Sequence, residues 1–226
     1  MSAAVRKRPS LYSTGVGKKY AMAITGLILM GYVLLHMVGN LKLYFGAESI
    51  NRYGEWLREI GEPAIPREWL LWALRLVLLA AVFIHIHAVY TLTQMNRQAR
   101  PVKYESKRDY VAADFASRTM RWTGIIVTAF VIFHLLDLTW GSANPDFVKG
   151  DVYGNIVASF ERIPVAIAYV IANLALGVHL YHGAWSLFQS MGWYGTWRRS
   201  FAIGFAAVVV LGNISFPLAV MFGVVN

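Results

Sequence analysis

The strongest pattern along the chain is a series of long apolar runs separated by short polar segments. Since a helix needs about 20 apolar residues to cross a bilayer, we expect spanning helices at Tyr20–Leu41, Trp69–Thr93, Trp122–Trp140, Pro164–Phe188 and Phe201–Val224. Between the first two runs, Ser49–Ile60 carries apolar residues at helical spacing and predicts a short helix on the membrane surface. The pattern predicts an all-α integral membrane protein: a bundle of five transmembrane helices that forms one domain over residues 1–226.

Composition supports a membrane protein. The 226 residues are 57% hydrophobic and only 15% charged, whereas soluble domains are roughly 45–50% apolar and about 25% charged. The chain has no cysteine, which excludes disulfides, thiolate metal sites and self-contained iron–sulfur clusters. We find no repeat with a period of 20–50 residues, and no apolar segment with a cleavage site that would indicate a removable signal peptide.

The basic residues predict an orientation. The formal net charge is +9, but these residues flank the apolar runs, so we expect no nucleic-acid partner. The segments before residue 20, between residues 94 and 121, and between residues 189 and 200 hold 14 of the 21 Lys and Arg residues. The positive-inside rule places such segments in the cytoplasm. We therefore expect a multi-pass protein of the cell's inner (plasma) membrane, with a cytoplasmic N-terminus and an external C-terminus.

Histidine is the candidate chemistry of this chain, because ionisable groups inside a membrane are costly and point to function. All six histidines fall within the predicted spans: His36, His85, His87, His134, His179 and His182.

Depth sorts the histidines into two layers. Counted from the outer ends of the spans, His36 and His134 lie roughly 11–12 Å deep, whereas His87 and His179 lie roughly 24–27 Å deep. Each layer offers two imidazoles from different helices, which is what bis-histidine haem ligation requires. Two histidines without a carboxylate or thiolate are an incomplete zinc site. Small residues such as Gly39 would let a porphyrin approach the backbone.

Depth does not choose between close neighbours in sequence. His85 and His87 lie about 200° apart around a helix, so only one of them can face a given haem. His179 and His182 are three residues apart and share a face. Both choices stay open on this argument.

Four motifs extend over nearly the whole chain: His36-Met-Val-Gly-Asn-Leu41, His87-Ala-Val-Tyr90, Arg121-Trp-Thr-Gly124 leading to Phe133-His134-Leu135, and His179-Leu-Tyr-His182-Gly183-Ala-Trp185. With these motifs the sequence resembles the cytochrome b membrane-anchor subunit of bacterial succinate dehydrogenase (succinate:quinone oxidoreductase, respiratory complex II), in its single-chain, five-helix, dihaem type.

The resemblance implies two b haems, with iron ligated axially by His36, His87, His134 and His179. His85 and His182 are then nearby contacts or alternative ligands. The implied function is to anchor a flavoprotein subunit with FAD and an iron–sulfur subunit on the cytoplasmic face. Electrons would pass from the iron–sulfur subunit through the inner haem, then the outer haem, to a membrane quinone. Dihaem relatives usually use menaquinone.

The quinone site is the least specified part of this prediction. Quinone reduction consumes protons, and Asp137 is the one acidic residue that we place inside a span, three residues after His134. We predict that Asp137 delivers protons to the quinone or contacts it. A cytoplasmic alternative would use Tyr12, Ser13 or Lys18. Some dihaem relatives carry a proposed proton-conducting Glu where this chain has Gly177.

Two other classes of protein remain as alternatives. One is the cytochrome b subunit of another membrane dehydrogenase, such as a formate dehydrogenase or hydrogenase, which shares bis-histidine ligation. The other is a proton-coupled transporter with histidine relays, although inverted repeats and broken helices are not evident. We also expect that the complex can form a homo-oligomer.

Overall fold

The computed structural model describes residues 10–99 and 115–226, without the side chains of residues 115–118. Every regular element in these residues is helical, and five helices are long and apolar enough to cross a membrane. This confirms the predicted spans. The elements are η1 (Leu11–Ser13), α1 (Gly15–Asn40), η2 (Leu41–Phe45), α2 (Ala47–Glu59), α3 (Trp69–Gln98), α4 (Phe115–Leu138), α5 (Val152–Glu161), α6 (Ile163–Ser190) and α7 (Trp197–Met221).

The surface of the long helices is apolar. Leu35 is 69% exposed, Phe83 64% and Leu211 70%, and many other large apolar side chains are similarly open. A soluble protein rarely exposes so much contiguous apolar surface, whereas lipid tails solvate it readily. The closed hydrogen bonding of a helix also satisfies the backbone where water is absent. The chain is therefore a multi-pass membrane protein.

The long helices pack in three close pairs, of which α6 with α7 is the most extensive. The backbone of α1 approaches that of α3, the backbone of α4 approaches that of α6, and α7 packs along α6 and also touches α1. Small residues permit the close approach of α7, since Ala184, Ala202 and Ala206 are all buried where α6 and α7 meet.

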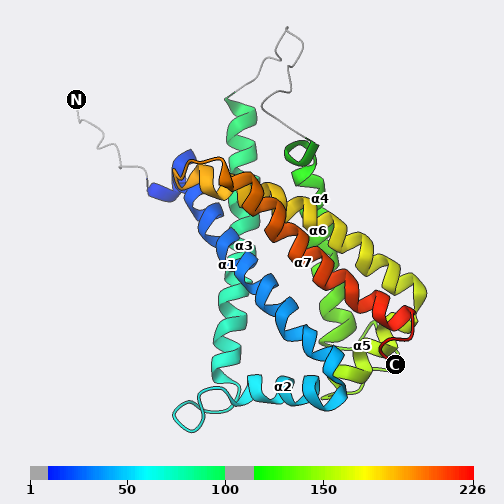
Figure 1. Cartoon of the computed structure of the whole chain (residues 1–226). Coiled ribbons are helices and arrows are strands. Elements are labelled where there is room, and N and C mark those ends of the chain that lie inside the picture. Colours follow the sequence, from blue (N-terminus) through cyan, green and yellow to red (C-terminus); the bar gives the residue numbers. More distant parts are fainter. Residues whose placement is uncertain (1–9, 100–114) are drawn as a thin grey trace, which may run out of the picture.

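Two short helices close one end of the bundle. Figure 1 shows α2 and α5 at the end opposite the N-terminus, with the C-terminus beside them. The short helix predicted at Ser49–Ile60 is confirmed as α2, whereas α5 was not predicted.

A polar contact joins these two short helices. Asp151 caps α5 by accepting from the backbone N–H of Gly154 at 3.0 Å, and it also accepts from Asn51 on α2 at 3.0 Å. Both hydrogen bonds favour the ionised carboxylate and hold the pKa of Asp151 below its ordinary value. This end of the bundle is thus fixed by side chains from both short helices.

Candidate functional site

One pair of histidines meets near the end of the bundle that carries α2 and α5. His36 lies four residues before the end of α1, and His134 lies four residues before the end of α4. Their ring centroids are 5.8 Å apart at an interplanar angle of 85°. An aromatic ring one turn earlier packs against each imidazole: Tyr32 stacks on His36 at 5.4 Å, and Phe130 tilts against His134 at 5.9 Å. The structure therefore brings together the two histidines expected in the outer layer.

A second pair lies deeper, towards the N-terminal end. Here the centroid of His85 on α3 is 6.5 Å from that of His179 on α6. The hydroxyl oxygen of Thr25 on α1 lies 3.1 Å from Nδ1 of His85. The hydroxyl oxygen of Thr123 on α4 lies 3.4 Å from Nδ1 of His179. Each imidazole is thus oriented by a threonine on the helix that packs beside its own.

The expected pairing of His87 with His179 is not the one in the structure. His87 is exposed on the other side of α3, and its Nδ1 lies 2.6 Å from the hydroxyl of Tyr12. The reason is the helix phase: α3 turns its His85 face towards the bundle interior, so a residue about 200° away must face outwards. His182 lies beside Ser186, whose hydroxyl oxygen is 3.1 Å from its Nε2.

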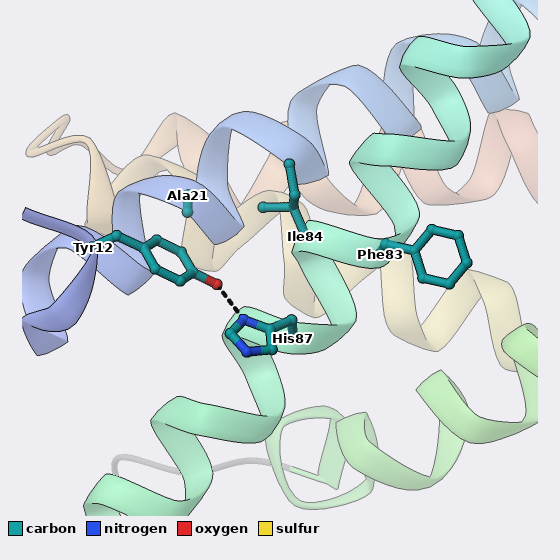
Figure 2. Close-up of a pocket in the computed structure, with 5 residues that line it drawn as sticks. All are labelled: Tyr12, Ala21, Phe83, Ile84 and His87. Carbon is teal, nitrogen blue, oxygen red and sulfur yellow. Dashed lines mark hydrogen bonds between the residues drawn. The ribbon is translucent and has the colours of Figure 1, made fainter.

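His87 lines a shallow pocket on the outside of α3. It encloses about 480 Å³ and is lined by Tyr12, Ala21, Phe83, Ile84 and His87. Figure 2 shows the Tyr12–His87 hydrogen bond at one side of an otherwise apolar lining. Lys18 lies nearby: its ammonium donates to the carbonyl of Tyr12 at 3.0 Å and sits 4.6 Å from the centre of that ring. Two of the residues in the cytoplasmic alternative, Tyr12 and Lys18, are thus found together.

Both internal histidine pairs have the spacing that haem ligation requires. Two imidazoles that bind one iron have centroids roughly 6 Å apart, because each metal–nitrogen bond is about 2 Å and each bound nitrogen lies about 1 Å from the centre of its ring. The observed separations are 5.8 Å and 6.5 Å. One pair joins α1 to α4 and the other joins α3 to α6. Among the described helices, neither α1 and α4 nor α3 and α6 pack closely backbone to backbone, so each histidine pair bridges two helices that are not direct neighbours.

Glycines lie against the deeper pair. A Cβ atom built on Gly26 would sit 3.6 Å from the ring of His85, and one on Gly124 would sit 3.4 Å from that of His179. These are ordinary van der Waals distances, so each glycine lies directly against an imidazole. Within the described residues, no three His, Asp or Glu side chains gather as they would around a free metal ion. Pairs of imidazoles with small neighbours suit a haem better than a zinc ion.

Asp137 is part of a buried polar network next to the outer pair. Its side chain is fully buried, and its Oδ1 accepts from Arg162 at 2.5 Å. Its Oδ2 accepts from Ser159 at 2.5 Å and from Tyr169 at 2.9 Å. The Tyr169 hydroxyl in turn lies 3.3 Å from Nδ1 of His134. Asp137 is thus linked to the outer imidazole through one tyrosine.

Sequence reasoning missed this network and the two threonines. Ser159 lies on α5 and Arg162 directly after it, and that helix was not predicted. Tyr169 lies on the predicted α6, but nothing along the sequence indicated that its hydroxyl would reach Asp137. A signal for the threonines was present. Met-x-x-Thr-Gly occurs at residues 22–26 and again at residues 120–124, each time with a histidine ten residues after the glycine. The period of this repeat is 98 residues, far longer than the 20–50 residues that were searched.

Five apolar helices with imidazole pairs between them define an integral membrane bundle that has polar groups in its core. A family model described as "Succinate dehydrogenase/Fumarate reductase transmembrane subunit" matches residues 94–214. The chain therefore belongs to this family, which implies association with the catalytic subunits of that complex. Searches of curated proteins and of solved structures found no match.

Proposed function

We propose that the chain is the electron-transfer and anchoring subunit of a succinate dehydrogenase and that it holds two b haems. The observation that carries this proposal is the presence of two imidazole pairs, each from two different helices, at two levels. Thr25, which contacts the deeper pair, and His36 of the outer pair are separated by eleven residues of α1, or roughly 16 Å of helix. The two proposed haem sites therefore lie at different depths along the membrane normal.

The proposed iron ligands are His36 with His134, and His85 with His179. Here the structure favours His85 over His87, because only His85 lies opposite an imidazole of α6. Bound haem supplies one-electron redox chemistry in the bundle core. The helices of the chain hold the four rings at fixed spacing, and their outward apolar side chains separate the rings from the lipid.

The N-terminal end of the bundle is the proposed docking face for the iron–sulfur subunit and the FAD-containing flavoprotein. The positive-inside rule places this end in the cytoplasm, within an inner-membrane topology. Arg198 and Arg199 lie at this end, in the first turn of α7. The basic residues between 100 and 114 belong to the same predicted face, but they lie outside the described residues.

The Tyr12–His87 pocket is the proposed position of the quinone head group, with menaquinone as the expected quinone. Ligand pockets combine a mostly apolar lining with a few polar groups, and this one offers a hydroxyl and an imidazole for the two quinone oxygens. The earlier candidate, Asp137, is fully buried, and both of its carboxylate oxygens already accept hydrogen bonds. The pocket is therefore the better candidate of the two.

Haem stoichiometry in single-histidine variants tests this function. The complex purified through this chain should contain flavin, and a pyridine haemochrome assay should find two haems per chain. His85→Ala and His179→Ala should each remove the same haem, whereas His36→Ala and His134→Ala should each remove the other, because a haem with one ligand is poorly held.

His87→Ala and His182→Ala are the matched controls and should retain both haems. A wild-type complex without haem would contradict the proposal. Loss of haem in His87→Ala but not in His85→Ala would show that His87 is the ligand, as the resemblance implied.

A further inference from the structure

Two of the close helix pairs, α1 with α3 and α4 with α6, are built on the same sequence unit. α1 carries Met-x-x-Thr-Gly, then an aromatic residue six positions after the glycine, then a histidine four positions later; α4 repeats this order. The matched positions are Met22 and Met120, Thr25 and Thr123, Gly26 and Gly124, Tyr32 and Phe130, His36 and His134. Each unit is completed by the helix that packs against it, α3 or α6, which brings the deeper histidine.

The repeated threonine contacts the same atom in each unit. The side chain of Thr25 is 5% exposed and lies by Nδ1 of His85, and that of Thr123 is 7% exposed and lies by Nδ1 of His179. Two helices that are far apart in sequence thus present a buried hydroxyl to an imidazole in the same way. Chance packing of a single threonine does not account for a contact that recurs at matched positions.

Each threonine hydroxyl has one proton, which it donates to a backbone carbonyl of its own helix. Thr25 donates to the carbonyl of Ala21 at 2.7 Å, and Thr123 donates to the carbonyl of Met120 at 3.0 Å. This back-bonding is typical of threonine inside helices. A hydroxyl whose proton is engaged in this way offers its oxygen to the neighbouring imidazole, which favours the tautomer with the proton on Nδ1 and the lone pair on Nε2.

We propose that Thr25 and Thr123 are matched positioning residues for the deeper haem. Each accepts a hydrogen bond from Nδ1–H of a ligating histidine, which fixes the ring orientation and reserves Nε2 for iron. Gly26 and Gly124, directly after the threonines, lie against the same rings. Hydrogen-bond partners of this kind orient metal ligands and raise their basicity. The inference rests on the proposed function, because it presupposes that His85 and His179 bind haem.

Thr25→Val and Thr123→Val test the inference in the purified complex, because valine keeps the shape but cannot accept a hydrogen bond. Each change should weaken retention of one haem by about 10- to 100-fold, and it should shift the low-spin EPR signal and midpoint potential of that haem alone. Thr25→Ser and Thr123→Ser should restore both readouts, since serine keeps the hydroxyl. Spectra of the haem held by His36 and His134 should not change.

Thr128→Val is the matched control on α4. Its hydroxyl also donates to its own helix, to the carbonyl of Gly124 at 2.8 Å, but at an exposed position. This variant should resemble the wild type. Valine variants with unchanged haem content and spectra, or serine variants that fail to restore them, would overturn the inference while leaving the proposed function intact. A wild-type complex without haem would instead overturn the proposed function, and the inference with it.

Discussion

His85 and His87 are two residues apart, yet their surroundings differ completely. His85 lies opposite His179 and beside the hydroxyl of Thr25, whereas His87 is exposed and pairs with Tyr12. Their chemistry is the same, so only the rotation of α3 separates the two roles. At the residue scale, function in this bundle depends on which side of a helix faces a neighbour.

Asp137 offers a test at the same scale. Asp137→Ala should lower the free energy of unfolding by about 3 kcal/mol, because it leaves Arg162 without its carboxylate in a mostly buried setting. Thermal unfolding in detergent would measure this loss. Glu161→Ala, an exposed carboxylate next to Arg162, is the control and should change stability by less than about 0.5 kcal/mol. Equal effects of the two changes would mean that the Asp137 network does not stabilise the fold.

At the scale of elements, the long helices could be predicted from the sequence and one short helix could not. An apolar run of 20 residues has few alternatives in a membrane, so each span was located within seven residues of its observed bounds. The helix α5 has only ten residues, too few for a clear period. Its N-cap, Asp151, was the available signal.

The contact between α6 and α7 explains why Gly177 is a glycine. A Cβ atom on Gly177 would lie 2.5 Å from a methyl group of Val210, and a β-branched side chain cannot easily turn away. Gly177→Ala should therefore destabilise the protein by about 1–3 kcal/mol, measured by thermal unfolding. Gly204→Ala on α7, where a Cβ atom meets nothing within 4 Å, should be neutral or slightly stabilising. A stable Gly177→Ala variant would show that α7 can shift.

At the scale of the whole molecule, the orientation in the membrane is a prediction from charge alone. The short helices α2 and α5 lie at one end and the N-terminus at the other (Figure 1). Since basic residues concentrate at the N-terminal end, the α2–α5 end should face outwards. The proposed docking face depends on this orientation, and so does the assignment of the His85–His179 pair to the inner side of the membrane.

The absence of cysteine makes the orientation simple to test. Single cysteines at two exposed positions, Glu48→Cys in α2 and Arg199→Cys in α7, should react differently with a membrane-impermeant maleimide applied to intact cells. Glu48→Cys should be labelled, whereas Arg199→Cys should be labelled only after the membrane is opened. The reverse pattern would place the N-terminal end outside.

The amino-acid sequence alone predicts that lipid surrounds the long helices, how many spans there are and how deep the histidines lie. These properties depend on composition and on the fixed rise of a helix, which need no knowledge of neighbouring elements. The tertiary structure decided that His85 rather than His87 faces His179, and that Asp137 is bonded to Arg162 and Tyr169. Both outcomes depend on the rotation and pairing of helices. Rotation and pairing are set by packing between segments far apart in sequence, so no local pattern along one helix could reveal them.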